Sequence, residues 1–207
     1  MASVYDKATR MVIESYYSQV AEEVVSKLKS GIILDLGTGP GYLPIEIVKR
    51  APFLKVDGID LTPRLIKIAK ENAVKASLVD RLHFEVGNAA RLRFEDSSYN
   101  MVISTGMLHM LRNPVKVLRE CYRVLKPGGE AWIYDPAQVS SQIDTRKWKA
   151  SLTFRERFLY GLFTLFRPFN PPHTYSREQA IQMIAATNFK VYWVEEGDSE
   201  IKIKLRK

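Results

Sequence analysis

The chain has 207 residues, of which 46% are hydrophobic and 26% charged, and this composition excludes an intrinsically disordered protein. No uncharged apolar run approaches the ~20 residues of a membrane-spanning helix, and the N-terminal segment lacks the apolar stretch of a signal peptide, so we expect one soluble, cytoplasmic domain over residues 1–207. The net charge of +8 is compatible with nucleic acid, anionic lipid or an acidic substrate as a partner and selects none of them.

The first two thirds of the sequence alternate between helical and strand patterns. Residues 4–29 are apolar at every fourth position, which predicts a helix that Ser30 and Gly31 end. Short apolar runs then predict five buried strands that alternate with helices. The predicted strands are Ile32–Leu36, Lys55–Asp60, Leu82–Val86, Asn100–Ser104 and Glu130–Tyr134, and the predicted helices are residues 42–50, 62–77 and 113–126.

The pattern changes after Asp135. Residues 137–172 are basic and aromatic with helical spacing, and we expect them to form a cap inserted after the fifth strand. Ser176 and Gln179 form a capping-box pattern that predicts a helix to about Ala186. Two last strands, Phe189–Glu195 and Glu200–Arg206, flank a Gly-Asp turn and are therefore expected to be antiparallel.

Together these elements predict an α/β fold with a doubly wound, Rossmann-like seven-stranded sheet. The sheet is expected to be mostly parallel, with a C-terminal antiparallel hairpin. Within the single domain we expect an N-terminal helical segment (1–30), a cofactor-binding core (31–136), the cap (137–172), and a terminal helix and hairpin (173–207).

A glycine-rich loop, residues 35–41, lies between the first predicted strand and the following helix. A doubly wound sheet binds nucleotides at this position. Asp60 ends the next strand, where a carboxylate can accept hydrogen bonds from a ribose diol. The loop reads G-x-G-x-G, not the dinucleotide pattern G-x-G-x-x-G, and Tyr42 stands where the last glycine would be. Because Asp35 adds negative charge and no basic residue lies nearby, the loop suits a cationic ligand better than a pyrophosphate.

With these motifs, the sequence resembles the class I S-adenosylmethionine-dependent methyltransferases. The resemblance covers about residues 31–136, including Lys126–Gly129 before the fifth strand. It implies that S-adenosylmethionine binds here and leaves as S-adenosylhomocysteine, with Asp60 on the ribose. The further cofactor-binding residues that it implies are Asp35, Gly37, Thr38, Gly39, Gly41, Leu61, Asn88, Ala89, Ser104 and Thr105.

Methyl transfer depends mainly on proximity and orientation, and needs a general base only when the acceptor must lose a proton. His109 and Asp135, which follow the fourth and fifth strands, are the candidate catalytic residues, and His173 and Tyr175 are weaker candidates. The sequence predicts no metal site. Its single cysteine, Cys121, is expected to be buried in a helix, which excludes covalent pyrimidine methylation and arsenic methylation through several thiols.

The apolar and basic stripe from Trp148 to Phe166 has several interpretations: ordinary core, a lid over the acceptor, or a helix at a membrane surface. We expect a methyltransferase for a small hydrophobic or anionic acceptor. The alternatives are an RNA or protein methyltransferase, a binding module without turnover, and a nicotinamide oxidoreductase, which the loop pattern disfavours. Peripheral membrane contact stays open, nucleic acid is not favoured as a partner, and the sequence does not indicate the oligomeric state.

Overall fold

The computed structural model describes residues 2–136, 174–197 and 200–207, with side chains from Ser15 onward. The predicted cap at residues 137–172 and His173 lie outside the described residues. The N-terminal half contains α1 (Ala2–Lys27), β1 (Ser30–Leu36), α2 (Tyr42–Arg50), β2 (Phe53–Asp60), α3 (Pro63–Lys75) and β3 (Leu82–Val86). The C-terminal half contains β4 (Tyr99–Thr105), the 3-10 turn η1 (Leu108–Met110), α4 (Pro114–Val124), β5 (Leu125–Pro136), α7 (Arg177–Ala185), β6 (Val191–Glu196) and β7 (Glu200–Arg206).

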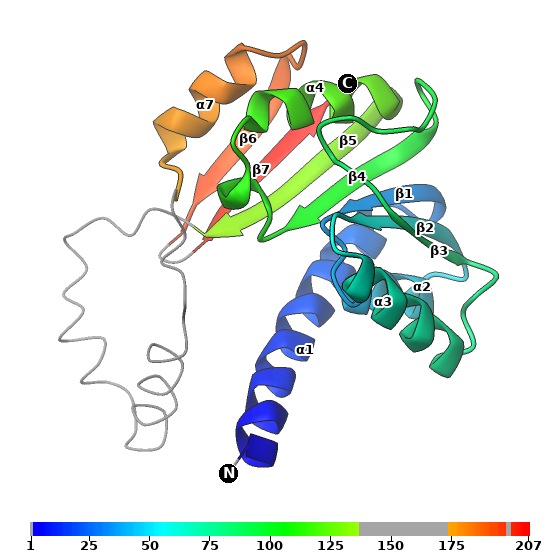
Figure 1. Cartoon of the computed structure of the whole chain (residues 1–207). Coiled ribbons are helices and arrows are strands. Elements are labelled where there is room, and N and C mark those ends of the chain that lie inside the picture. The colour runs from blue at the N-terminus through cyan, green and yellow to red at the C-terminus, as the bar shows by residue number, and fades with distance from the viewer. Residues whose placement is uncertain (1, 137–173, 198–199) are drawn as a thin grey trace, which may run out of the picture.

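The seven strands form one sheet in the order β3-β2-β1-β4-β5-β7-β6 (Figure 1). The first five strands are parallel to one another, and β7 is antiparallel to both β5 and β6. This arrangement confirms the predicted doubly wound sheet with its C-terminal hairpin. Because β1 and β4 are neighbours, their carboxyl ends meet where the order of the strands reverses, which is where such sheets bind ligands.

Helices cover the two faces of the sheet with separate apolar cores. One core joins residues of α1, α2 and α3 to the sheet, and the other lies between the sheet and α4 and α7. Polar contacts also fasten α1 to the C-terminal strands. Glu23 accepts hydrogen bonds from Lys202 at 2.8 Å and from the Tyr134 hydroxyl at 3.1 Å, and Lys27 pairs with Glu130 at 2.8 Å. The N-terminal helix is therefore held against strands that come much later in the chain.

The structure corrects the predicted start of β5. The sequence predicts a helix to residue 126, then a turn, and a strand only from Glu130, but α4 ends at Val124 and β5 starts at Leu125. Leu125 pairs with Tyr99, and the ladder resumes with Glu130 opposite Met101 after an irregularity. Gly128 takes a φ of 78° within that irregularity, so the Pro-Gly-Gly sequence bends the strand without ending it.

Candidate active site

The glycine-rich loop makes a tight turn from β1 into α2, and backbone hydrogen bonds draw it to the end of β2. The N–H groups of Gly37 and Thr38 both donate to the carbonyl of Ile59 at 2.9 Å. Gly37, Gly39 and Gly41 have φ values of 73°, 54° and 78°, which are strained for residues with a side chain. The local fold thus depends on glycine at alternate positions.

The three glycines face different surroundings. A Cβ atom at Gly37 would lie 3.1 Å from Met107, and one at Gly41 would lie 2.9 Å from the ring of Phe84. A Cβ atom at Gly39 would meet nothing within 4 Å. Packing therefore accounts for Gly37 and Gly41, whereas Gly39 leaves its backbone open to a ligand.

Asp60 connects this open backbone to the end of β2. Its Oδ2 accepts from the Gly39 N–H at 3.1 Å, and its Oδ1 accepts from the Thr62 N–H at 2.8 Å. Each carboxylate oxygen can accept a further bond, so the half-buried Asp60 can still bind two hydroxyl groups.

Beside Asp60 lies a cavity of about 260 Å³. Its walls come from the loops after β1, β2, β3 and β4, as expected for a ligand at the carboxyl ends of parallel strands. The cavity is lined by Gly37, Ile59, Asp60, Leu61, Thr62, Gly87, Asn88, Ala89, Gly106, Met107, Met110 and Leu111. Leu61 is 66% exposed at its rim, and Asn88 Oδ1 accepts from the Ala90 N–H at 2.9 Å, which fixes this side chain in a turn.

Asp35 and Thr38 carry polar atoms that have no partner among the described residues. Both side chains are buried, and Asp35 Oδ1 and Thr38 Oγ1 make no hydrogen bond there. Burial raises the pKa of Asp35 to about 7, against an opposing effect of Thr38 and with a smaller contribution from nearby Asp60. A buried carboxylate with an unused oxygen is completed by a positively charged donor, which agrees with the expected preference for a cationic ligand.

The two predicted catalytic residues lie next to each other. His109 Nδ1 is 3.2 Å from Asp135 Oδ2, and the backbone N–H groups of Leu108 and His109 donate to the same carboxylate at 3.0 and 2.8 Å. Burial raises the pKa of Asp135, although the contacts with His109 oppose that rise. Since Asp135 fixes one ring nitrogen, the other can accept a proton from a ligand.

A second cavity, of about 320 Å³, lies on the Asp135 side of the loop after β4. It is lined by Tyr16, Tyr17, Thr105, Gly106, Tyr134, Asp135, Pro136 and Glu200. Gly106 lines both cavities, and a Cβ atom there would meet nothing within 4 Å. The two cavities therefore share Gly106. Asp135 lines the second cavity, whereas His109 lines neither and lies behind Asp135, which it contacts.

The tyrosines and Glu200 were not predicted as site residues. Tyr16 in α1 donates to Glu200 in β7 at 2.7 Å, across 184 residues of sequence. Burial raises the pKa of both Tyr16 and Tyr17, so these hydroxyls stay protonated. The regular apolar spacing of α1 was a signal for a core helix only, and nothing in it indicated a cavity.

Other predicted residues lie in less direct positions. Ser104 is 1% exposed and donates to the carbonyl of Leu36 at 3.0 Å, so it joins β4 to β1, whereas its neighbour Thr105 lines the second cavity. Tyr175 is half-buried against the core under α7, and burial raises its pKa. Cys121 is fully buried, as predicted.

Comparison with known proteins agrees with this geometry. Residues 33–129 match a family model described as a methyltransferase domain. The ubiquinone/menaquinone biosynthesis C-methyltransferase of Geotalea daltonii is 27% identical over 65% of this chain and 59% of its own length. The arsenite methyltransferase of Halobacterium salinarum is 34% identical over 52% of this chain and 28% of its own length. The chain thus spans less than two thirds of either relative.

A solved structure supports the fold over a longer range. A SAM-dependent methyltransferase from Aquifex aeolicus superposes with a TM-score of 0.68 over 90% of this chain and 88% of its own, at 21% identity. The predicted resemblance is confirmed for the motifs within residues 33–129 and for the order of the strands. Residues 33–129 therefore match the methyltransferase domain family, and the chain shares the fold of a SAM-dependent methyltransferase of known structure.

Proposed function

We propose that the protein is an S-adenosylmethionine-dependent methyltransferase that acts on a small organic acceptor. The observation that carries the proposal is the open backbone at Gly39, held by the Asp60 carboxylate, together with the unpartnered oxygen of Asp35 at the start of the same loop. The loop and the end of β2 thus offer a close backbone approach, an acceptor for a diol and a counter-charge for an ammonium group.

The residues of the first cavity fit the donor. Asp60 would bind the ribose hydroxyls, Leu61 would cover the adenine, and Asn88 and Ala89 would contact its edge. Asp35, with Thr38 beside it, would accept from the ammonium group of the methionine part. S-adenosylmethionine supplies a methyl group on a positively charged sulfur, so that group needs no further activation.

The second cavity is the proposed acceptor site, and His109 is the proposed general base. Gly106 lines both cavities, Thr105 and Asp135 line the second, and Asp135 holds His109 next to it. In this role the free ring nitrogen of His109 takes the proton that the acceptor loses. Asp135 stabilises the resulting imidazolium and orients the ring.

The relatives suggest two acceptor chemistries, and the chain favours one of them. Arsenite binds to thiolates, but the chain has a single cysteine. Burial raises the pKa of Cys121 to about 12 and keeps it a thiol. The quinone-type acceptor of the C-methyltransferase relative needs no thiolate, and an aromatic ring fits a cavity lined by three tyrosines.

Within the described residues, no helix is long and apolar enough to cross a membrane.

A methyl-transfer screen tests this proposal. The wild-type protein is incubated with tritiated S-adenosylmethionine and separate fractions of quinols, other metabolites, protein and RNA, beside Asp60→Ala as a donor-site variant. We expect label in a small-molecule fraction, lost in the variant. Label in RNA or protein alone would contradict the proposal of a small-molecule acceptor. Absence of label in every fraction would contradict the proposal that the protein transfers methyl groups.

A further inference from the structure

Strand β6 ends the sheet with an unusually apolar and open edge. Among the described residues it pairs only with β7, and its ladder from Val191 to Glu196 contains no bulge. Val191, Tyr192 and Trp193 are 47%, 39% and 50% exposed. Edge strands are usually protected by charged residues, proline or a bulge, and residues 191–194 contain none of these.

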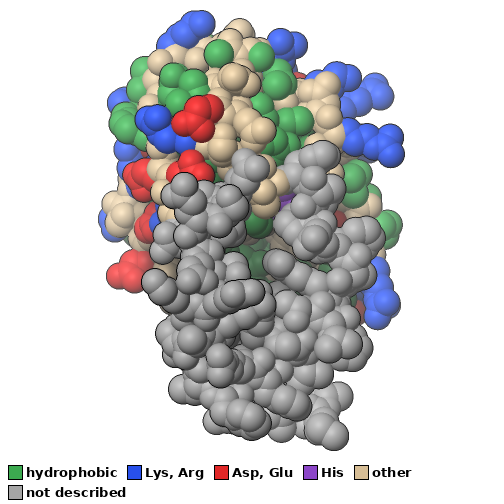
Figure 2. All heavy atoms as spheres, turned by 90° about the vertical axis from the view of Figure 1, so that its left-hand side faces the viewer, with side chains coloured by type: hydrophobic (Ala, Val, Ile, Leu, Met, Phe, Trp, Pro, Cys, Tyr) green, Lys and Arg blue, Asp and Glu red, His purple; other side chains and the backbone are tan. Residues whose placement is uncertain are grey.

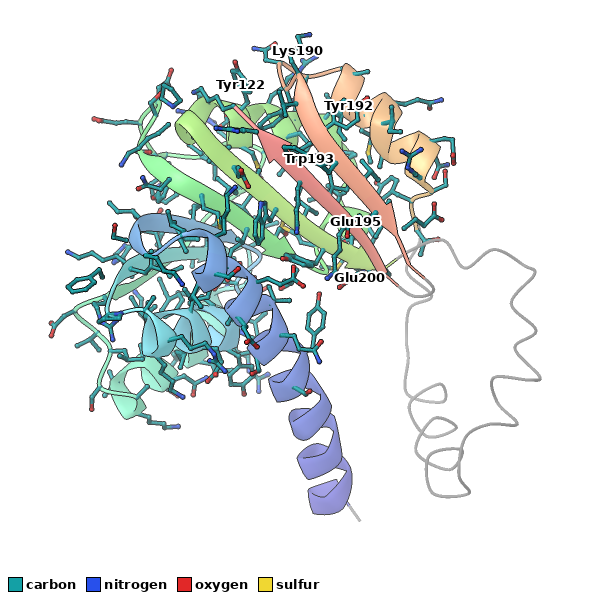
Figure 3. The ribbon with its side chains drawn as sticks, turned by 180° about the vertical axis from the view of Figure 1, so that it is seen from behind. Tyr122, Lys190, Tyr192, Trp193, Glu195 and Glu200 are labelled. Atoms are coloured by element: carbon teal, nitrogen blue, oxygen red, sulfur yellow. The ribbon has the colours of Figure 1, made fainter. Side chains whose placement is uncertain are left out.

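The charges of β6 and of the residue before it are separated by sign. Lys190 precedes the strand and Glu195 and Glu196 end it, whereas on β7 Lys204 lies opposite Trp193 and Lys202 opposite Glu195. Figure 3 shows Lys190 near one end, Trp193 about midway, and Glu195 and Glu200 at the opposite end. Figure 2 shows that basic and acidic side chains both lie on this side of the molecule, around exposed hydrophobic ones.

A surface with this arrangement is complementary to a copy of itself turned through 180°. We propose that β6 pairs antiparallel with β6 of a second copy of this chain, about a two-fold axis at Trp193. In that register Trp193 lies opposite Trp193 of the second copy, and Tyr192 lies opposite its Val194. Lys190 faces Glu196 of the second copy, and by symmetry the reverse pair also forms.

Two features of the edge bear on this pairing. The Arg177 side chain donates to the carbonyl of Val194 at 3.4 Å, a long and exposed bond that a backbone N–H of the second strand can replace. Glu195 and Glu196 of β6 argue against an anionic membrane as the occupant, because both would face the lipid phosphates. A second copy neutralises both ends at once, which favours it over a membrane.

The oligomeric state of the whole chain tests the inference independently of methyl transfer. Sedimentation velocity over a range of protein concentrations should show a dimer of the wild type. Trp193→Lys should dissociate it, with a thermal melt to show that the variant is folded. Phe53→Lys is the matched control, because Phe53 is 77% exposed near the other end of the strand order and lies outside the proposed interface.

Charge reversal tests the register. Lys190→Glu and Glu196→Lys should each raise the dimer dissociation constant by roughly tenfold or more, since each turns two attractive contacts into repulsive ones. The double variant in one chain restores opposite charges across the axis and should dimerise again. A wild type that stays monomeric at every concentration overturns the inference, as does a dimer that Trp193→Lys leaves intact. A double variant that fails to recover overturns the register.

Discussion

The donor and acceptor sides of the proposed site are built in different ways. The donor side is made from the loops after β1 to β4, and its central contact joins Gly39 to Asp60, only 21 residues later in the chain. The acceptor side is made from side chains that the fold brings together, such as Tyr16 and Glu200, which are 184 residues apart. The donor side can thus be recognised from a short stretch of sequence, whereas the acceptor side exists only after the sheet has assembled.

The largest expected effect on the donor side comes from Gly39→Val. The new side chain would fill the open space over the loop, so we expect loss of detectable S-adenosylhomocysteine binding by calorimetry. The positive φ adds strain of about 1–3 kcal/mol, which the fold should survive. Gly128→Val is the control, since Gly128 also has a positive φ and open surroundings but lies away from both cavities. Equal binding by the Gly39 variant and wild type would show that no ligand approaches this loop.

On the acceptor side, replacement of the His109–Asp135 pair should impair turnover and spare donor binding. General-base catalysis contributes about 10²–10⁴-fold, so His109→Ala should lower kcat by that factor. Asp135→Asn should also lower kcat, because His109 loses its charged partner. S-adenosylhomocysteine affinity should stay within a few-fold in both variants.

His83 provides the control, because it is an exposed histidine on β3, outside both cavities. Its replacement by alanine should leave kcat unchanged. Full activity of His109→Ala on the true acceptor would exclude His109 as the general base. The orientation of donor and acceptor would then be the main catalytic effect.

Asp60→Ala should have an intermediate effect, confined to the donor. Loss of charge-assisted hydrogen bonds costs about 1.5–3 kcal/mol, which corresponds to roughly 10- to 150-fold weaker binding of both S-adenosylmethionine and S-adenosylhomocysteine. Asp80→Ala removes an exposed carboxylate elsewhere and should bind normally. Equal calorimetric affinities for the Asp60 variant and wild type would rule out the ribose contact.

The smallest expected effect is a pH dependence of stability through Asp35. Its folded pKa of about 7 lies above the usual carboxyl value of 3.8, so the folded protein retains a proton that the unfolded chain has lost between these values. This contribution to the stability of the ligand-free protein is present below pH 4 and is lost as the pH rises through 7.

Asp35→Asn cannot ionise and should therefore gain a few degrees in Tm relative to wild type at pH 8, but not at pH 4. The same variant should bind S-adenosylmethionine more weakly, since the ammonium group loses its counter-charge. A Tm difference that does not change with pH would show that Asp35 stays ionised in the folded protein.

The same contrast explains what could be predicted from the sequence. Alternating apolar runs and turn residues are local signals, and they predicted the sheet with its terminal hairpin. The predicted start of β5 was wrong because Leu125 already pairs with Tyr99 before the Pro-Gly-Gly bend. The residues of a turn do not show that a strand continues through it. His109 and Asp135 were singled out separately, but their pairing depends on neighbouring β4 and β5.

Most of the acceptor cavity could not be predicted, since only Thr105 and Asp135 of its lining residues were predicted as site residues. Its tyrosines sit in a helix whose pattern indicates only burial, and Glu200 is one polar residue in an alternating strand. Only the contacts of α1 with β5 and β7 bring them together.

Calorimetric titration of the wild-type protein with S-adenosylhomocysteine, and separately with NAD, tests the central claim most directly. A diol-bearing ligand with an ammonium group should bind at a single site per chain, whereas a pyrophosphate finds no basic partner in residues 35–48. We therefore predict binding of S-adenosylhomocysteine with none of NAD. Binding of NAD with none of S-adenosylhomocysteine would contradict the account.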